Sequence, residues 1–210
     1  MFIIMLSIVS TLLSLVTNAY SVVNALLTQY GYYAILLLMT MEYASLPVPS
    51  EVILPLIGFF AAKGTFNFFS ALAVVLVAGI IGMAIDYFIA YYVGKDVIYK
   101  HAARFHISKA RLDEFDAWFN RNGAFAVFIA RLIPVARGLI SLPAGFAMMG
   151  KKKFFLYSTA GAFIWDVVLM LFGYYDLASN SVGVVLSGIA VFAVAIYVIY
   201  RLATASLKKK

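Results

Sequence analysis

Residues 31–62 read GYYAILLLMTMEYASLPVPSEVILPLIGFFAA, and this stretch decides the fold class. It is apolar enough to enter a membrane, but its apolar run before Glu42 covers about ten residues, whereas a spanning helix needs about 20. Pro47, Pro49 and Pro55 follow, and each proline removes a backbone donor and disfavours helix in the residue before it. We therefore predict a segment that enters the membrane as a helix, breaks, and returns to the same face.

A second stretch, residues 123–150, repeats this plan and reads GAFAVFIARLIPVARGLISLPAGFAMMG. Its short apolar run meets Arg131, and prolines and glycines follow within a few residues. The residues expected to break the two stretches are Pro47, Pro49, Pro134, Pro143, Gly138 and Gly145. Apolar runs of roughly 10–14 residues suggest re-entrant segments. We therefore predict two re-entrant helical hairpins, an outer one over 31–64 and an inner one over 123–150.

Composition places the rest of the chain in a membrane as well. Of its 210 residues, 65% are hydrophobic and 12% are charged, about half the roughly 25% charged residues of soluble proteins. So few polar groups could not cover a soluble domain, which makes a soluble enzyme, a disordered segment and a nucleic-acid-binding domain poor fits. The absence of Cys excludes disulfides, thiolate catalysis and Cys-metal sites. His101 and His106 have no evident third ligand, so we expect no metal site and no cofactor.

Four longer apolar segments predict full transmembrane helices, because each reaches the roughly 20 residues that a span needs. They lie near residues 3–27, 67–94, 154–175 and 182–202. The first is apolar from Phe2 onward without a basic region before it, which favours a transmembrane helix over a signal peptide. We expect one all-α polytopic membrane domain over residues 1–210, with about four transmembrane helices and two re-entrant hairpins.

The Lys and Arg residues orient this layout, because cytoplasmic loops of membrane proteins carry an excess of both. With both termini in the cytoplasm, 13 of the 16 basic residues fall on the cytoplasmic side, and Lys63 is the basic loop residue left outside. The two hairpins then enter from opposite faces. That pattern is typical of an inverted repeat and indicates a transport site near the midplane of the membrane. We expect a multi-pass protein of the cell membrane.

Residues 95–122 predict a cytoplasmic amphipathic helix. Ser108 fits an N-cap, and Asn122 with Gly123 would end the helix. Apolar residues recur at three- and four-residue spacing on one face, and they are Leu112, Phe115, Trp118 and Phe119. Such a helix lies on a membrane surface or on the base of the protein itself.

Six ionisable residues fall at the predicted membrane depth. They are Glu42 and Glu51 in the outer hairpin, Arg131 and Arg137 in the inner one, and Asp86 and Asp166 in the second and third spans. Each costs at least roughly 2.5–3.5 kcal/mol on insertion scales, so six are too costly to be incidental unless they are paired or hydrated. Three glycines on the same spans, Gly79, Gly82 and Gly161, are expected to permit close helix packing.

Two interpretations of the hairpin charges stay open. In the structural one, a glutamate of the outer hairpin pairs with an arginine of the inner one and pins the tips together. In the functional one, the two arginines converge on a phosphate, whose geometry matches guanidinium forks, and exposed amides at the helix breaks assist. Glu42 or Glu51 would then carry a proton. Asp86 and Asp166 fit a cross-helix hydrogen bond and the proton path equally well.

Two motifs at these residues resemble the signatures of the DedA family, whose membrane domain is also called the SNARE-associated or VTT domain. Residues 42–51, EYASLPVPSE, resemble its E-x(4)-P-x-P-x-E signature, and residues 128–137, FIARLIPVAR, resemble its F-x-x-R-x-x-P-x-x-R signature. The match covers about residues 30–176. It continues at Pro143-Ala144-Gly145, Met149, Phe154, Gly161, Trp165 and Gly173-Tyr174. The family often has Gly-Asp together in the second span, whereas the acid here is Asp86, so the family role of that acid does not transfer to it.

The resemblance implies a membrane lipid transporter. Bacterial members are associated with recycling of the polyprenyl-phosphate carrier and with dependence on cations or the proton-motive force, and eukaryotic relatives with phospholipid scrambling. We therefore expect a flippase that moves a lipid phosphate between leaflets. Arg131 and Arg137 would bind the phosphate, and Glu42 and Glu51 would couple transport to protons or cations.

Other functions stay open at this point. The chain could be a proton-coupled transporter of a small solute or cation, a phospholipid scramblase, or a scaffold without transport. An enzyme is disfavoured, because neither histidine lies in a predicted span, Cys is absent, and no serine sits in a Gly-x-Ser-x-Gly setting. In each transport case the expected partners are membrane lipids and protons or cations, and nucleic acid is not among them.

Overall fold

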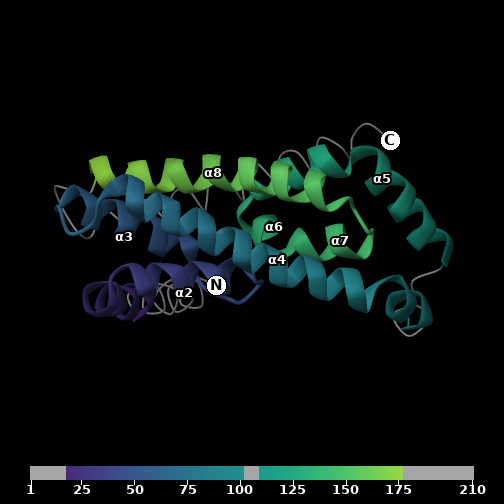
Figure 1. Ribbon diagram of the computed structural model, residues 1–210, viewed down its shortest axis with the longest axis horizontal. Coiled ribbons are helices and arrows are strands. Elements are labelled where there is room, and N and C mark those ends of the chain that lie inside the picture. Colours follow the sequence, from purple (N-terminus) through teal and green to yellow (C-terminus); the bar gives the residue numbers. More distant parts are fainter. Residues whose placement is uncertain (1–17, 102–108, 177–210) are drawn as a thin grey trace, which may run out of the picture. The chain divides into compact units, whose positions relative to one another are not determined.

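Helices supply all the regular secondary structure in the part of the chain that the computed structural model describes, residues 18–101 and 109–176. The first described residues, 18–30, are helical. The helices that follow are α2 (Tyr32–Tyr43), α3 (Ser50–Ala62), α4 (Phe68–His101), α5 (Lys109–Arg131), α6 (Pro134–Leu139), α7 (Ser141–Phe146) and α8 (Lys151–Asp176) (Figure 1). The prediction of an all-α fold is confirmed for these residues.

Two of these helices, α4 and α8, are long and apolar enough to cross a membrane. Their apolar segments cover Phe68–Val93 and Lys151–Tyr175, with mean hydropathies of 2.6 and 1.7. Only 33% and 39% of the most apolar windows are buried, whereas the core helix of a soluble protein is mostly buried. The segments correspond to the spans predicted near 67–94 and 154–175. The other two predicted spans lie mostly or wholly outside the described residues.

The outer stretch breaks where its first two prolines lie. Helix α2 ends at Tyr43 and α3 begins at Ser50, and residues 44–49 between them are not helical. Pro47 and Pro49 lie in this connection. Because a proline disfavours helix in the residue before it, the two prolines keep α2 and α3 from joining into one helix.

Residue contacts divide the described chain into two compact units. Unit 1 comprises residues 18–35, 49–72 and 167–176, and unit 2 comprises residues 36–48, 73–101 and 109–166. Unit 1 therefore holds α3 and the C-terminal end of α8. Unit 2 holds α5, α6 and α7, together with the end of α2, most of α4 and the first part of α8.

In unit 1, α3 packs on the end of α8 through backbone contact at glycines. A Cβ atom added at Gly58 or at Gly173 would collide with the backbone of Met170 or of Pro55, respectively. Pro55 disfavours helix locally, yet α3 continues through it to Ala62. Nine of the 13 residues of α3 are buried, and this packing offsets the helical hydrogen bond that a proline removes.

Helix α5 runs without a break from Lys109 to Arg131. The expectation that Asn122 and Gly123 end an amphipathic helix is therefore wrong. A glycine inside a helix costs only about 1 kcal/mol relative to alanine. Here the glycine also leaves room for a ring, since a Cβ atom at Gly123 would lie 2.8 Å from the ring of the buried Phe119.

Of the predicted amphipathic segment, residues 95–101 lie in α4 and residues 109–122 lie in α5, and residues 102–108 between them are outside the described ranges. Of the four residues expected on its apolar face, Phe119 is buried and Trp118 is 48% exposed. The side chains of the other two, and the N-cap expected at Ser108, lie outside what the structure describes.

The chain breaks again at the end of α5, where two residues are not helical before α6 begins at Pro134. Proline is well tolerated at the first position of a helix, because its missing N–H would have no helical partner there. Three other residues expected at breaks lie inside helices instead, Gly138 in α6 and Pro143 and Gly145 in α7. Gly145 packs against α4, where an added Cβ atom would lie 2.7 Å from that of Ala90.

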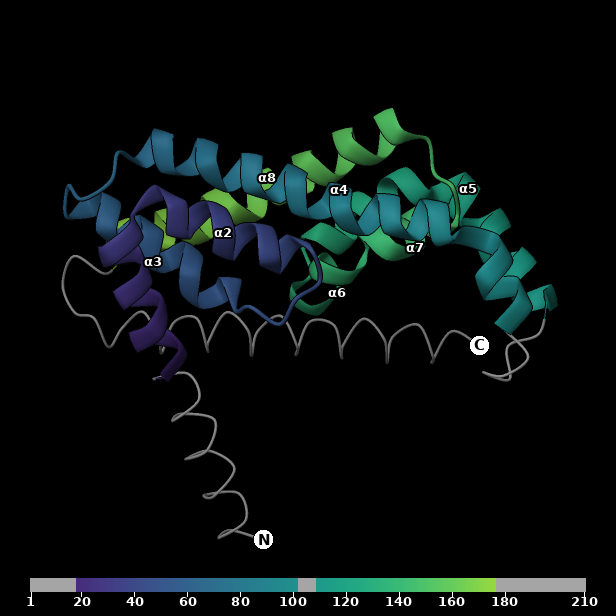
Figure 2. The ribbon, with the colours of Figure 1, turned by 60° about the horizontal axis from the view of Figure 1, so that its bottom comes forward.

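In unit 2, α5, α6 and α7 contact one another (Figure 2), and glycines bring the longer helices close to their neighbours. A Cβ atom at Gly161 of α8 would lie 2.7 Å from the Cβ atom of Arg131 at the end of α5. A Cβ atom at Gly82 of α4 would collide with Thr40 and Tyr43 of α2. These glycines permit close helix packing, as the sequence predicts, and Arg131 and Tyr43 are both fully buried.

Candidate functional site

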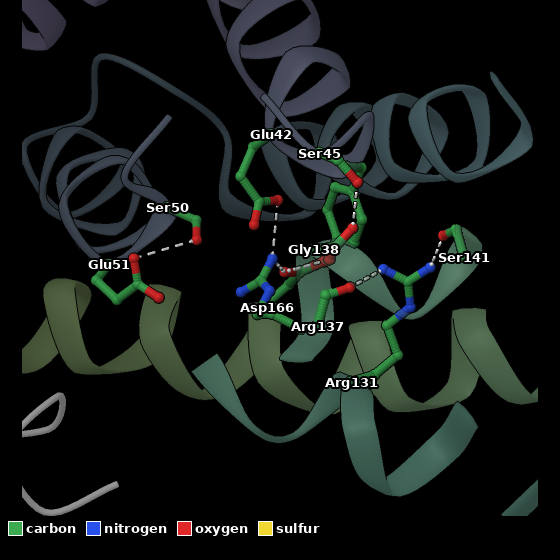
Figure 3. Close-up of polar contacts among 10 residues, drawn as sticks. Glu42, Ser45, Ser50, Glu51, Arg131, Arg137, Gly138, Ser141 and Asp166 are labelled. Carbon is green, nitrogen blue, oxygen red and sulfur yellow. Dashed lines mark hydrogen bonds and ion pairs between the residues drawn. The ribbon is translucent and has the colours of Figure 1, made fainter. Parts of the chain in front are cut away.

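Four of the six predicted ionisable residues meet in one buried cluster within unit 2. Glu42 comes from the end of α2, Arg131 from the end of α5, Arg137 from α6 and Asp166 from α8 (Figure 3). Each of these residues is at most 6% exposed. Two arginines and two carboxylates are formally neutral together, and such pairing is what makes buried charges tolerable.

An ion pair joins the two sequence motifs. Arg137 donates from Nη2 to Oε2 of Glu42 over 3.0 Å, and the same nitrogen lies 3.8 Å from Oδ1 of Asp166. The guanidinium also lies 5.4 Å from the ring centre of Trp165. The pairing that the structural interpretation expects, between a glutamate of the first motif and an arginine of the second, is present between Glu42 and Arg137.

Tyr43, next to Glu42 in the chain, contacts both arginines and the aspartate. Its hydroxyl donates to the carboxylate of Asp166 and lies 2.9 Å from each of its oxygens. The guanidinium carbons of Arg137 and Arg131 lie 5.1 Å and 5.5 Å from the centre of its ring, within the range of a cation–π interaction. The phenol thus supplies a hydrogen bond to the carboxylate and an aromatic surface to both cations.

Arg131 makes its hydrogen bonds to neutral oxygens. Its Nη1 donates to the backbone carbonyl of Arg137, Nη2 donates to Oγ of Ser141 over 2.6 Å, and Nε donates to Oγ of Ser158 over 3.2 Å. These acceptors belong to α6, α7 and α8, so one fully buried guanidinium ties the end of α5 to three further helices. Arg131 therefore holds in place the backbone that carries Arg137.

Asp86, on α4, makes a polar contact of its own. Its carboxyl group is hydrogen-bonded to Oγ of Ser45, in the connection between α2 and α3, and the same hydroxyl lies 2.7 Å from the backbone carbonyl oxygen of Gly138 in α6. Asp86 is buried. Ser45 has a φ of 57°, in the left-handed region that residues other than glycine rarely adopt. The contact joins three segments of unit 2 around one carboxyl group.

Glu51 belongs to unit 1. It is the second residue of α3, where a carboxylate is favourable because the N-terminus of a helix carries a partial positive charge. Its Oε2 lies 3.5 Å from Oγ of Ser50, which is a weak contact (Figure 3). The role of Glu51 in coupling stays a prediction.

Four hydroxyl side chains complete the site, although the sequence motifs do not single them out. They are Tyr43, Ser45, Ser141 and Ser158. Each is a polar residue in an apolar or broken stretch, and a buried hydroxyl needs a hydrogen-bond partner. A single polar residue within an apolar stretch is therefore the sequence feature from which they could have been predicted. Within the described ranges, no three residues among His, Cys, Asp and Glu are grouped as a metal ion would require.

Comparison with known proteins places this arrangement in a family. The family model of the VTT domain matches residues 48–175. Undecaprenyl phosphate transporter A of Staphylococcus aureus (strain NCTC 8325 / PS 47) is 30% identical to the chain, and the match covers 87% of this chain and 91% of the relative. The protein of the same name from Bacillus subtilis (strain 168) is 31% identical, with 83% and 88% covered. Protein DedA of Escherichia coli (strain K12) is 26% identical, with 71% and 72% covered.

No solved structure matches this chain. The VTT domain nevertheless accounts for more than half of its residues, and the two transporters are matched over most of their own length. The two long apolar helices agree with a membrane protein. The chain belongs to the DedA family of membrane proteins, whose membrane domain is the VTT domain.

Proposed function

We propose that this protein moves a lipid phosphate, specifically a polyprenyl phosphate, between the leaflets of its membrane. Two relatives that are matched over most of their length are named undecaprenyl phosphate transporter A, which supports a lipid-phosphate substrate. The same names favour translocation over catalysis. The proposed step forms and breaks no covalent bond, so it needs an anion site and a path for an apolar tail.

One observation carries the proposal: Arg137 is a buried guanidinium whose carboxylate partner a phosphate can replace. The 3.0 Å contact from Arg137 to Glu42 is a charge-assisted hydrogen bond. A phosphate offers the same guanidinium two oxygens in the fork geometry that suits it best. Substrate and Glu42 are therefore alternative partners for Arg137.

Charge balance makes this exchange depend on a proton or another cation. When a phosphate displaces Glu42, the cluster gains negative charge, which is costly in a buried site. A proton taken up by Glu42 restores the balance. Loss of that proton lets the carboxylate return to Arg137 and expel the phosphate. Asp166, 3.8 Å from the same nitrogen, is the second carboxylate of this exchange.

In this proposal Arg131 holds the surrounding helices in place and Arg137 binds the phosphate of the substrate. Arg131 is fully buried, and three of its N–H groups donate to neutral oxygens of α6, α7 and α8. A guanidinium held in this way cannot follow a moving ligand without breaking those bonds. The expectation that both arginines bind phosphate thus narrows to Arg137 as the direct ligand.

We extend the proposal to the membrane topology, with both termini in the cytoplasm and oppositely facing re-entrant hairpins over 31–64 and 123–150. The helix breaks after α2 and after α5 support it, because broken backbone at membrane depth is tolerated where it is buried in protein or lines a cavity. The apolar tail of the substrate would follow the exposed apolar faces of the spans. On α4 such a face forms a shallow groove lined by Ile81, Ile85 and Ile89, among others.

Movement of labelled polyprenyl phosphate across proteoliposome membranes tests the substrate. The matched control is the corresponding polyprenol, which has the same tail and lacks the phosphate. We expect the phosphate to be moved and the alcohol to stay, because only the phosphate can replace Glu42 at Arg137. Equal movement of both compounds, or of ordinary phospholipids, would show scrambling and refute the proposal.

A further inference from the structure

A second polar contact, partly buried, lies beside the arginine cluster and has its own partners. Oγ of Ser45 is hydrogen-bonded to the carboxyl group of Asp86 and lies 2.7 Å from the carbonyl oxygen of Gly138. Ser45 comes from the connection after α2, Asp86 from α4 and Gly138 from α6. One hydroxyl group therefore stands between a carboxyl oxygen and a backbone carbonyl oxygen.

The number of protons in this contact limits the state of Asp86. A serine hydroxyl donates one hydrogen bond, and a backbone carbonyl and an ionised carboxylate only accept. If Asp86 were ionised, its carboxylate and the Gly138 carbonyl would have to share the one proton of Ser45 in a three-centre bond. If Asp86 is protonated, it donates to Ser45, and Ser45 donates to Gly138. The protonated acid therefore gives each contact a proton of its own, which favours that state.

The backbone at Ser45 supports a specific role for this hydroxyl. Its φ of 57° lies in the left-handed region, which costs a residue other than glycine on the order of 1–3 kcal/mol. Such strain persists where the surrounding structure holds the residue in place, and it gathers at functional sites. The strained turn brings the Ser45 hydroxyl to both oxygens at once.

One arginine of the cluster acts on Asp86 from a distance. Arg131 of α5 is the charged side chain that acts electrostatically on Asp86 among the described residues. Its side-chain hydrogen bond is to the neutral hydroxyl of Ser45. Arg131 attracts the ionised form, whereas the hydrogen-bond chain favours the protonated form. Two states of Asp86 therefore compete.

We propose that Asp86 is a proton-binding site, distinct from the carboxylates of the arginine cluster, and that Ser45 transmits its protonation state to α6. When the proton leaves Asp86 for water, Ser45 turns its own proton to the new carboxylate, and the Gly138 carbonyl loses its donor. Gly138 follows Arg137 directly in the chain, so loss of this bond loosens the residue that meets the substrate. The protonation of Asp86 does not depend on the proposed function, whereas its effect on transport rests on that function.

Infrared spectroscopy of the purified full-length protein tests the protonation, because a protonated carboxyl group has a C=O stretching band that a carboxylate lacks. We expect a band at neutral pH that disappears in Asp86→Asn and shifts in Ser45→Ala, which removes the hydrogen-bond partner. Asp166→Asn is the matched control and should leave that band unchanged. A spectrum from which Asp86→Asn removes no such band would overturn the proposal. If Asp86→Asn does not fold, an unshifted band in Ser45→Ala overturns it equally.

Transport measured as a function of pH gives a second readout. An asparagine at position 86 can donate to Ser45 as the protonated acid does, so Asp86→Asn should remove one ionisation step from the pH profile. An unchanged profile contradicts the link to transport. If the wild-type protein moves no polyprenyl phosphate at all, the proposed function fails, while the infrared spectra still decide whether Asp86 carries a proton.

Discussion

At the scale of single residues, the ion pair of Arg137 and Glu42 is costly to lose by half, whereas both members can be replaced together at little cost in stability. Removing one member of a buried ion pair costs about 3–5 kcal/mol, because the other charge is left without compensation. Replacing both members by apolar residues of similar volume is often neutral or stabilising. A pair that stability alone does not require is consistent with a ligand site.

This contrast gives a first prediction for the stability of the protein. Glu42→Leu and Arg137→Leu should each destabilise the fold by about 3–5 kcal/mol, and the double variant should be destabilised by less than the sum. Thermal unfolding of the purified variants in detergent measures the three differences. Additive losses would mean that the two residues do not interact, against the 3.0 Å contact.

A second prediction concerns Tyr43, whose hydroxyl donates to Asp166 and whose ring contacts both guanidiniums. Tyr43→Phe removes the hydroxyl and keeps the ring. Because hydrogen bonds to charged groups contribute about 1.5–3 kcal/mol, we expect a loss of that size in the free energy of unfolding. Tyr43→Leu should cost more, since it also removes the cation–π contacts. Equal losses in both variants would show that the ring contributes nothing.

At the scale of elements, the packing of unit 2 depends on glycines that let helices approach. Gly161 is the contact between α8 and the end of α5, where the Cβ atom of Arg131 and the carbonyl oxygen of Phe128 would lie 2.7 and 2.8 Å from an added methyl group. A side chain there would push α8 away from the backbone on which Arg131 is built. The position of the guanidinium therefore depends on the absence of a side chain on the facing helix.

The third prediction follows from this contact. Gly161→Ala should destabilise the protein by about 1–3 kcal/mol, the usual cost of overpacking, even though alanine is the better helix former. Gly150→Ala is the matched control, because no atom lies within 4 Å of an added Cβ atom there. Unfolding temperatures of the two variants give the comparison. A Gly161→Ala protein as stable as the control would show that α5 and α8 are less closely packed than described.

Some helix breaks can be predicted from the sequence and others cannot, because some depend on local backbone chemistry and others on contacts with distant segments. The breaks near Pro47, Pro49 and Pro134 follow from local backbone chemistry, so they can be predicted from the residues alone. Pro55 and Gly145 lie inside helices, because contacts with distant segments decide their conformation. Local propensity contains no information about contacts with residues more than fifty positions away in the chain.

At the scale of the whole molecule, the charges at membrane depth can be found in the sequence, but their partners cannot. Charged residues stand out in apolar segments, and four of them meet in one buried cluster: Glu42, Arg131, Arg137 and Asp166. The different surroundings of the two arginines, a carboxylate for one and neutral oxygens for the other, depend on which helices meet. That information lies in the packing and in no single motif.

The fourth prediction tests the proposed orientation of the whole chain. The protein has no cysteine, so a single introduced cysteine reports on its own position without further changes. In intact cells, Lys63→Cys should react with a membrane-impermeant thiol reagent, and Lys152→Cys should react only after the cells are permeabilised. Both lysines are exposed or near the ends of apolar helices, which makes them accessible. If only Lys152→Cys reacted in intact cells, the protein would have the opposite orientation in the membrane. If both variants reacted in intact cells, the two hairpins could not enter from opposite faces as proposed.

The most direct test of the central claim is polyprenyl phosphate transport by Arg137 variants in proteoliposomes. We predict that Glu42→Gln/Arg137→Gln, which removes one charge of each sign from the cluster, loses transport. Arg137→Lys keeps the charge but loses the bidentate fork and should transport less. The lost charge-assisted bond is worth about 1.5–3 kcal/mol, or roughly 10- to 100-fold in affinity. Lys152→Ala, at an exposed position near the start of α8, should transport as the wild type does. Full transport by the folded double variant would contradict the claim that Arg137 binds the phosphate.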